Sequence, residues 1–202
     1  MKIHLCSGDI YLRDYINCDI DGFILAPDGL SIERDQQRVE LLNGNPNETD
    51  LAHYFKYPFH QDATKRMRRP FIIDRRMNIL EPWLFSSDTI DEIVSISAFE
   101  HFEHHTELPL IIDEAHRVLK TGGVWKFDYP DIKKIVELFH DDNPEFMAEQ
   151  IYCNHKNKYS VHQWGYTNKS IPLYLKPDKW QLVFKDVVKH DYPMTGVWAT
   201  KI

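Results

Sequence analysis

Two short β-rich segments near the N-terminus each lead to a residue that can serve a ligand site. Residues 2–7 run into Gly8, and residues 15–20 contain Asp19. If the two segments are parallel neighbouring strands, Gly8 and Asp19 both lie at carboxyl ends, where open α/β sheets bind ligands. Glycine lets a ligand approach the backbone, and a carboxylate can accept hydrogen bonds from ribose hydroxyls. A turn glycine and a surface aspartate are the alternative interpretation.

Residues 100–105, Glu-His-Phe-Glu-His-His, form a second group with catalytic chemistry. An imidazole such as that of His101 can deprotonate a hydroxyl or amine when a neighbouring carboxylate sets its tautomer. His101 with His104 or His105 would suit a metal ion only on a regular helix. Thr106 indicates a helix that begins after this cluster. We therefore expect no metal site here, and Glu100 and His101 are the candidate catalytic residues.

Residues 107–131 are the most regular part of the sequence, with a helix, a glycine stop and a strand in succession. One apolar stripe recurs at helical spacing, formed by Leu108, Ile111, Ile112, Ala115, Val118 and Leu119. Thr106 is the expected N-cap, and Gly122 is expected to end the helix in the left-handed conformation. Residues 123–128 then form a strand. Because a helix that returns directly into a strand is half of a right-handed βαβ unit, the pattern predicts a parallel sheet.

Further segments complete an α/β pattern. Strands are predicted at residues 71–74, 90–97, 180–189 and 194–201, and a short helix at residues 132–139. The link between the first two strands is shorter than the dozen or so residues of a crossover helix, so an abbreviated loop is expected there.

The segment at about residues 22–70 is predicted to be an insertion that caps the ligand-binding edge. It leaves the second strand at its carboxyl end, and long connections of this kind are usually lids or binding loops. Four aromatic residues are followed by the basic residues Lys65, Arg66, Arg68 and Arg69. Arginine suits phosphate or carboxylate, so the basic run is a candidate anion site, with a solvated surface as the alternative.

The composition indicates a single soluble domain. The 202 residues are 43% hydrophobic and 27% charged, which suffices for a packed core. The net charge of −7 disfavours nucleic acid as a partner. No apolar run approaches the roughly 18 residues of a membrane helix, and the N-terminus enters a strand without a signal segment. Cys6, Cys18 and Cys153 are odd in number and widely spaced, which favours reduced thiols and a cytoplasmic location.

Taken together, these motifs resemble the class I S-adenosylmethionine-dependent methyltransferases. The resemblance rests on the glycine-ended first strand, the acid-ended second strand, and the motifs Ile90-Asp91-Glu92-Ile93, Phe99-Glu100-His101-Phe102 and Arg117-Val118-Leu119-Lys120-Thr121-Gly122-Gly123. A small branch of the family with a short first loop and an Ile-Asn-x-Asp second strand is the most similar. Residues 162–167 also resemble the family's loop before the last helix and strands. The resemblance covers most of the chain except residues 22–70.

The resemblance implies a fold and a cofactor. The fold would be α/β and Rossmann-like, with a mostly parallel seven-stranded sheet, an antiparallel last strand and helices on both faces. Residues 1–202 would form one methyltransferase-like domain, with the insertion as an added cap. The cofactor would be S-adenosylmethionine.

The resemblance also implies roles for individual residues. The cofactor-binding residues would be Cys6, Ser7, Gly8, Asp19, Ile20, Asn78, Ile79 and Ser97. The first three would face the methionine part of the cofactor, Asp19 the ribose, and Asn78 with Ile79 the adenine. Glu100 and His101 would lie toward the substrate. The sequence departs from the family at Cys6, which is usually glycine, at Asn78, which is usually aspartate, and at His4, which is often an acid or asparagine.

The expected function is methyl transfer to a small-molecule acceptor that the sequence does not identify, anionic and sugar-like acceptors being two options. The alternative is a non-catalytic Rossmann-like binding protein, an inactive relative of the methyltransferases. A nicotinamide dehydrogenase is disfavoured because no G-x-G-x-x-G motif follows the first strand. The oligomeric state is left open.

Overall fold

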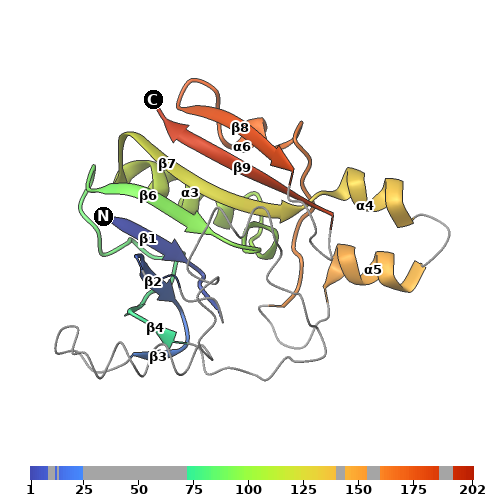
Figure 1. Ribbon diagram of the computed structural model, residues 1–202, viewed down its shortest axis with the longest axis horizontal. Coiled ribbons are helices and arrows are strands. Elements are labelled where there is room, and N and C mark those ends of the chain that lie inside the picture. Colours follow the sequence, from blue (N-terminus) through green and yellow to red (C-terminus); the bar gives the residue numbers. More distant parts are fainter. Residues whose placement is uncertain (9–11, 13, 25–71, 140–143, 154–159, 187–192) are drawn as a thin grey trace.

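Seven strands form one mixed sheet in the computed structural model, which describes residues 1–8, 12, 14–24, 72–139, 144–153, 160–186 and 193–202 (Figure 1). The strands are β1 (Lys2–Leu5), β2 (Ile16–Asp19), β5 (Arg75–Arg76), β6 (Ile90–Ser95), β7 (Leu119–Pro130), β8 (Trp180–Asp186) and β9 (Met194–Lys201). Their order in the sheet is β5-β2-β1-β6-β7-β9-β8. This order confirms the predicted fold class.

The strand directions bring the candidate site residues to one edge. β1 pairs in parallel with β2 and β6, β2 with β5, and β6 with β7. The last strand, β9, is antiparallel to both β7 and β8, as expected. The carboxyl ends of β1, β2 and β6 therefore lie at a common edge, on the lower right of the sheet in Figure 1.

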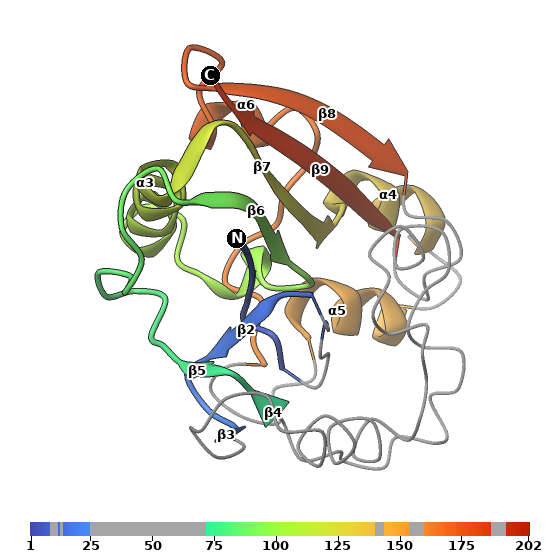
Figure 2. The ribbon, with the colours of Figure 1, turned by 60° about the vertical axis from the view of Figure 1, so that its left-hand side comes forward.

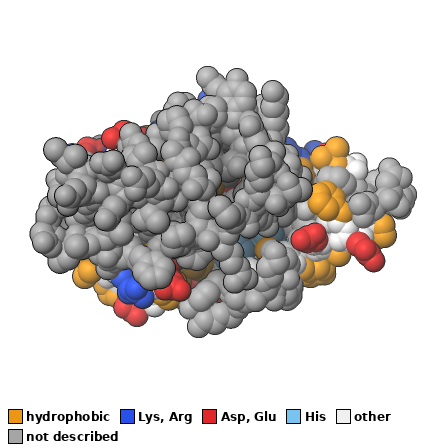
Figure 3. Space-filling view, turned by 60° about the horizontal axis from the view of Figure 1, so that its bottom comes forward, with side chains coloured by type: hydrophobic (Ala, Val, Ile, Leu, Met, Phe, Trp, Pro, Cys, Tyr) orange, Lys and Arg blue, Asp and Glu red, His pale blue; other side chains and the backbone are white. Residues whose placement is uncertain are grey.

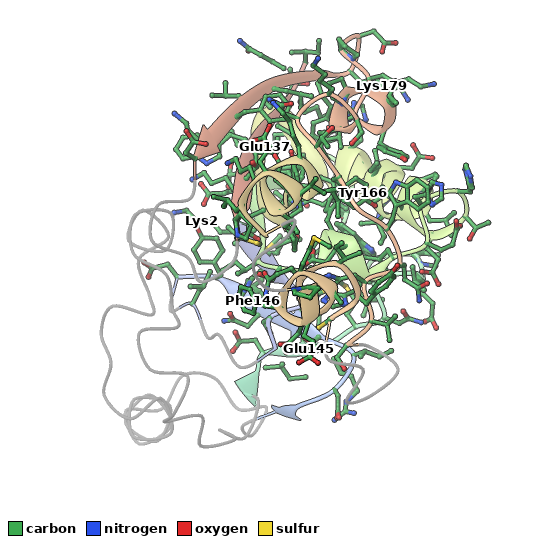
Figure 4. All side chains as sticks on the ribbon, turned by 90° about the vertical axis from the view of Figure 1, so that its right-hand side faces the viewer. Lys2, Glu137, Glu145, Phe146, Tyr166 and Lys179 are labelled. Atoms are coloured by element: carbon green, nitrogen blue, oxygen red, sulfur yellow. The ribbon has the colours of Figure 1, made fainter. Side chains whose placement is uncertain are left out.

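The helices of the described residues lie on one face and at one end of this sheet. They are α3 (Glu107–Val118), α4 (Ile132–Phe139), α5 (Pro144–Tyr152) and the short α6 (Ile171–Tyr174), with a 3₁₀ turn, η3, at Phe99–His101. α3 and α6 lie behind the sheet in Figure 1, whereas α4 and α5 extend beyond the end of β7. Figures 2 and 4 show this end from two further sides, with α4 labelled at Glu137 and α5 at Glu145 in Figure 4. α4 has its predicted bounds, but α5 was not predicted.

An aromatic core ties the site-bearing turn η3 to the sheet. The predicted stripe of α3 is buried from Leu108 to Val118. Beside it, the ring of Phe99 stacks on that of Phe127 with the centroids 4.2 Å apart, and it meets Tyr166 edge-on at 5.8 Å. All three rings are at most 2% exposed. Dense packing of this kind allows little movement of the turn that follows β6.

The predicted glycine stop of α3 is wrong. The helix ends at Val118, and β7 begins directly at Leu119. The last carbonyls of the helix are already satisfied, because Asp88 N–H donates to Arg117 O at 3.0 Å and Thr89 N–H to Val118 O at 2.9 Å. A left-handed glycine cap is therefore not needed.

Gly122 does adopt the left-handed conformation, with φ +79°, but within β7. It lies where the pairing with β6 shifts register, from Ile90 opposite Leu119 to Glu92 opposite Val124. Gly122 and Gly123 therefore allow an irregularity in the strand and do not end the helix.

The start of α3 also differs in detail from the prediction. Thr106 is the N-cap residue, as expected, but its side chain makes no capping hydrogen bond. Instead, the Glu103 carboxylate accepts hydrogen bonds from the backbone N–H groups of His105 and Thr106, at 2.9 and 2.6 Å. Glu103 N–H in turn donates to Glu107 Oε2 at 2.9 Å. The carboxylates of Glu103 and Glu107 thus stabilise the helix start by accepting hydrogen bonds from backbone N–H groups.

The strand predicted at residues 71–74 belongs to a different sheet. β4 (Ile72–Ile73) pairs with β3 (Phe23–Ile24) in a separate two-stranded sheet, and the third strand of the main sheet is β5. Asp74 divides the two short strands, since its N–H donates to Asn17 O and its carboxylate accepts from Asn17 N–H. Most of the predicted insertion, residues 25–70, lies outside the described residues.

Candidate functional site

The first and second strands bring the predicted ligand residues together. Gly8 N–H donates to Asp19 Oδ2 at 2.9 Å, and Ser7 N–H donates to Cys18 O at 3.2 Å. The turn after β1 is therefore fixed against the end of β2. The Asp19 carboxylate also accepts the Asp21 N–H at 3.2 Å, through Oδ1. Two backbone amides thus orient the carboxylate at the edge of the sheet.

Three residues at this edge adopt positive φ angles: Cys6 (52°), Gly8 (52°) and Ser97 (46°). Residues other than glycine rarely adopt this conformation, and backbone strain of this kind concentrates at functional sites. A Cβ added at Gly8 would meet nothing within 4 Å, so the backbone there borders open space among the described residues. Burial raises the pKa of the Cys6 thiol, which keeps it protonated and a poor nucleophile.

The predicted adenine residues lie in a turn that follows β5. Met77 N–H donates to Asp19 O at 2.8 Å, which brings this turn to the end of β2. The side chain of Asn78 is engaged within the turn: its amide donates to Glu81 Oε1 at 3.0 Å and its oxygen accepts from Leu80 N–H at 3.1 Å. Ile79 is half-buried beside the core. The neighbouring Ile20 is 40% exposed.

Glu100, His101 and His162 form a cluster beside the end of β6. Glu100 is only 2% exposed, and burial raises its pKa to about 8. Its Oε1 lies 4.0 Å from His101 Nε2 and 3.9 Å from His162 Nε2. Burial lowers the pKa of His101, so its imidazole is neutral at pH 7. A neutral imidazole beside a buried carboxyl can exchange a proton or hold a cation.

Backbone hydrogen bonds hold the two segments of this cluster together. Gln163 N–H and Trp164 N–H both donate to Glu100 O, at 2.7 and 3.3 Å. The ring of Trp164 also stacks on His104, with the centroids 3.5 Å apart. His104 and His105 were weighed as metal-binding partners of His101. Both lie after the end of η3 and before α3, so they are not on a helix. Figure 3 shows a small area of histidine surface on the face that it presents, beside the hydrophobic and acidic surface of α4 and α5.

Some site residues were missed by the sequence analysis. His162 was predicted only as part of a loop that resembles the family. It lies 62 positions from Glu100 in the sequence, so no local sequence pattern indicates that the two side chains meet. The Asp128 carboxylate accepts the Ser97 N–H at 2.6 Å and so holds the left-handed turn after β6. The buried Asn17 bonds His4 and the backbone of Leu12, which fixes the short first loop. A signal for Asp128 was available, because this acid ends the strand predicted at residues 123–128 and lies near the carboxyl end of β7.

Comparisons with known proteins agree on the fold. No protein-family profile matches the sequence. No curated protein is found as a relative. Among solved structures, a SAM-dependent methyltransferase from Methanosarcina mazei is 13% identical with a TM-score of 0.54, and the match covers 100% of this chain and 92% of that chain. One from Thermotoga maritima is 11% identical with a TM-score of 0.52, covering 100% and 82%. A protein from Pyrococcus horikoshii is 15% identical with a TM-score of 0.54, covering 100% and 81%.

The chain has the fold of the class I SAM-dependent methyltransferases. At these identities the likeness concerns the fold, which hosts many different acceptors. The described residues contain no helix that is long and apolar enough to cross a membrane.

The residues at the sheet edge fit such a cofactor in two respects. Among the described residues, nothing lies within 4 Å of a Cβ added at Gly8, as needed for a close approach to a ligand. Ser7 Oγ is buried and has no hydrogen-bond partner among the described residues. A buried hydroxyl without a partner is costly, and a polar ligand group at this place would satisfy it.

Proposed function

We propose that this protein is an S-adenosylmethionine-dependent methyltransferase that acts on a small-molecule acceptor. The observation that carries the proposal is the bond between Gly8 N–H and the Asp19 carboxylate at the carboxyl edge of a sheet with methyltransferase strand order. Each oxygen of this carboxylate can accept a further hydrogen bond, which suits the hydroxyls of a ribose at this edge. Cys6, Cys18 and Cys153 are thiols and not disulfides, which supports a cytoplasmic setting.

Each part of the edge has a role in this proposal. Cys6, Ser7 and Gly8 would hold the methionine part of the cofactor, Asp19 and Ile20 the ribose, and Asn78 with Ile79 the adenine. Ser97 would border the cofactor at the end of β6. When bound, the cofactor supplies a methyl group on a positively charged sulfur, which a lone pair of the acceptor can attack.

Glu100 and His101 would serve the acceptor. The neutral imidazole of His101 keeps a lone pair at Nε2, because its Nδ1 lies 2.9 Å from the carbonyl oxygen of Val161 and must donate to it. This lone pair can accept the proton of a hydroxyl or amine. Much of the remaining acceleration would come from holding the acceptor in line, as in other bimolecular reactions on proteins.

The proposal is tested by calorimetry with S-adenosylhomocysteine. Wild-type protein should bind one equivalent, and Asp19→Ala should bind about 10- to 100-fold more weakly, as expected for the loss of hydrogen bonds to a charged group. Asp113→Ala, an exposed change on α3, is the matched control and should bind like wild type. Equal affinity in the folded Asp19→Ala protein would remove Asp19 from the cofactor site.

The second candidate is a non-catalytic binding protein with the same fold. The position of Cys6 favours it, because a side chain stands in a left-handed turn where the family usually has glycine. The two functions separate on cofactor affinity: a thermal shift with S-adenosylhomocysteine supports the methyltransferase, whereas its absence in folded wild-type protein supports the binding protein.

A further inference from the structure

Three residues with metal-binding side chains converge at the end of β6, from two segments of the chain. Glu100, His101 and His162 each offer one ligand atom, and these atoms all lie within 4.8 Å of one another. Glu100 and His101 belong to η3, while His162 belongs to the segment that Glu100 O holds through the N–H groups of Gln163 and Trp164. The cluster is thus fixed by the backbone and not only by side chains.

Both imidazoles are held in the tautomer that a metal site requires. His101 Nδ1 lies 2.9 Å from Val161 O, and His162 Nδ1 lies 3.0 Å from Gln150 O. Because a carbonyl oxygen only accepts, each Nδ1 carries the hydrogen and each Nε2 carries a lone pair. Both Nε2 atoms face Glu100 Oε1, at 4.0 and 3.9 Å. Hydrogen bonds of this kind orient metal-binding histidines in proteins.

Glu100 supplies an independent observation. Its side chain is buried, and Oε2 has no hydrogen-bond partner among the described residues. A carboxyl group buried in this way either stays neutral or, as a carboxylate, is paired with a cation or coordinates a metal. A cation between this carboxylate and the two imidazoles would be attracted to all three.

We propose that Glu100, His101 and His162 bind one divalent transition-metal ion of the zinc type. Two histidines and one glutamate form a ligand set of catalytic zinc, whereas magnesium and calcium prefer oxygen ligands. Ligands at about 2.1 Å from a tetrahedral zinc lie about 3.4 Å from one another, so Glu100 Oε1 and each Nε2 need to approach by about half an ångström. Three protein ligands leave a fourth position for an oxygen ligand.

Metal binding does not depend on the cofactor, but its use in the reaction rests on the proposed function. An acceptor hydroxyl at the fourth position would lose its proton more readily, since a bound zinc ion lowers the pKa of its oxygen ligand. The lone pair of His101 would then act through the metal instead of taking the proton directly.

Titration of chelator-treated protein with Co²⁺ and Zn²⁺ tests the proposal. We expect one equivalent of Co²⁺ to give a saturable visible absorption band typical of a low-coordinate site, and Zn²⁺ to displace it. Mg²⁺ should produce no competition. Absence of saturable Co²⁺ binding to the folded wild-type protein would overturn the proposal, whatever the variants do.

Three variants and one control assign the site. Glu100→Gln, His101→Gln and His162→Gln should each weaken Co²⁺ binding at least 10-fold, while the exposed His105→Ala should bind like wild type. Binding that survives in the folded His101→Gln and His162→Gln proteins, or that is lost equally in His105→Ala, contradicts the assignment. S-adenosylhomocysteine affinity, measured on the same metal-free samples, reports separately on the cofactor site, so failure of one proposal does not imply failure of the other.

Discussion

Cys6 holds a backbone conformation that glycine adopts at lower cost. Its φ of 52° lies in the left-handed region, where a β-carbon crowds the following carbonyl oxygen. Cys6 nevertheless lies between β1 and the turn at Gly8, and burial raises the pKa of its thiol, which stays protonated. The strain is therefore a property of the backbone path at the proposed cofactor site and not of thiol chemistry.

A pair of substitutions at this position separates strain from packing. Cys6→Ala and Cys6→Gly both remove the thiol, but only Cys6→Gly relieves the left-handed conformation. We expect Cys6→Gly to be more stable than Cys6→Ala by about 1 kcal/mol in urea denaturation. Equal stabilities, or a less stable glycine variant, would show that the turn is not strained at Cys6.

At the scale of single residues, part of the candidate site was predictable from the sequence. Gly8 and Asp19 were predicted to lie together because each stands at the carboxyl end of a predicted strand, and strand ends can be predicted from local patterns. The approach of His162 to Glu100 depends on how a distant loop folds back, which no spacing reveals. Metal binding was therefore considered only for His101 with His104 or His105, which are close in sequence, and no metal site was expected. The structure places His162 beside His101.

At the scale of elements, the irregularity in β7 just after its join to α3 depends on two glycines. A Cβ added at Gly123 would lie 2.8 Å from Lys120 O and 3.2 Å from Ile90 O, both backbone atoms that cannot move aside easily. At Gly122 a Cβ would meet nothing within 4 Å, and only the φ of +79° opposes a side chain. Two adjacent glycines are thus required for different reasons.

Alanine substitutions test this difference. Gly122→Ala should cost about 1 kcal/mol, the usual price of an alanine in the left-handed conformation. Gly123→Ala should cost more, about 1–3 kcal/mol, because the backbone must shift to relieve the contacts. Chemical denaturation measures both, and a Gly123→Ala protein as stable as wild type would contradict the geometry of this join.

The errors at this scale arise where tertiary contacts decide an element's ends. The apolar stripe of α3 was predicted, but its end was not, because residues 88 and 89 satisfy the last carbonyls from another segment. α5, Pro144–Tyr152, was missed because its sequence has no apolar stripe at helical spacing. Its one buried residue is the polar Gln150. The third strand was misplaced by a few residues because β4 and β5 are each two residues long.

At the scale of the whole molecule, the buried His4 links stability to pH. Burial in the middle of β1 lowers the pKa of His4 to about 4, against 6.5 in the unfolded chain. The unfolded state therefore binds a proton at a higher pH than the folded state does. Stability from this residue is complete above pH 6.5 and is lost as the pH falls toward 4.

Replacement of His4 by Gln checks this linkage. Between pH 7 and pH 4 the free energy of unfolding of the wild type should fall by more than that of His4→Gln, with a difference on the order of 3 kcal/mol. Urea denaturation at several pH values gives both curves, and titrations of other groups largely cancel between the two proteins. Parallel curves would show that His4 is not buried in its neutral form.

The predicted cap lies outside the described residues and remains a proposal. We propose that its basic run contributes to an anionic acceptor site, which Arg66→Gln, Arg68→Gln and Arg69→Gln together would test. S-adenosylhomocysteine affinity should be retained, whereas binding of an anionic acceptor should weaken and lose its salt dependence. Unchanged acceptor binding would make this run a solvated surface.

The topology was the most predictable feature of the whole molecule. The direct return from α3 into β7 implied a parallel sheet, and the family resemblance implied the seven mostly parallel strands with an antiparallel last strand that the structure confirms. Local patterns cannot show how the edge strands and the loop at residues 160–167 close around the sheet, since those contacts join residues far apart in the chain.

The stack of His104 on Trp164 has an optical consequence. Trp164 is 43% exposed and follows His162 by two residues, whereas Trp83, Trp125 and Trp180 are buried in the core at 3%, 1% and 2%. The emission of an indole changes with contact to an imidazole and with exposure to water. The protein therefore carries a fluorophore whose signal follows the segment beside the candidate site, and three buried ones whose signals follow global unfolding. Ligand binding and denaturation can thus be observed separately in one unlabelled sample.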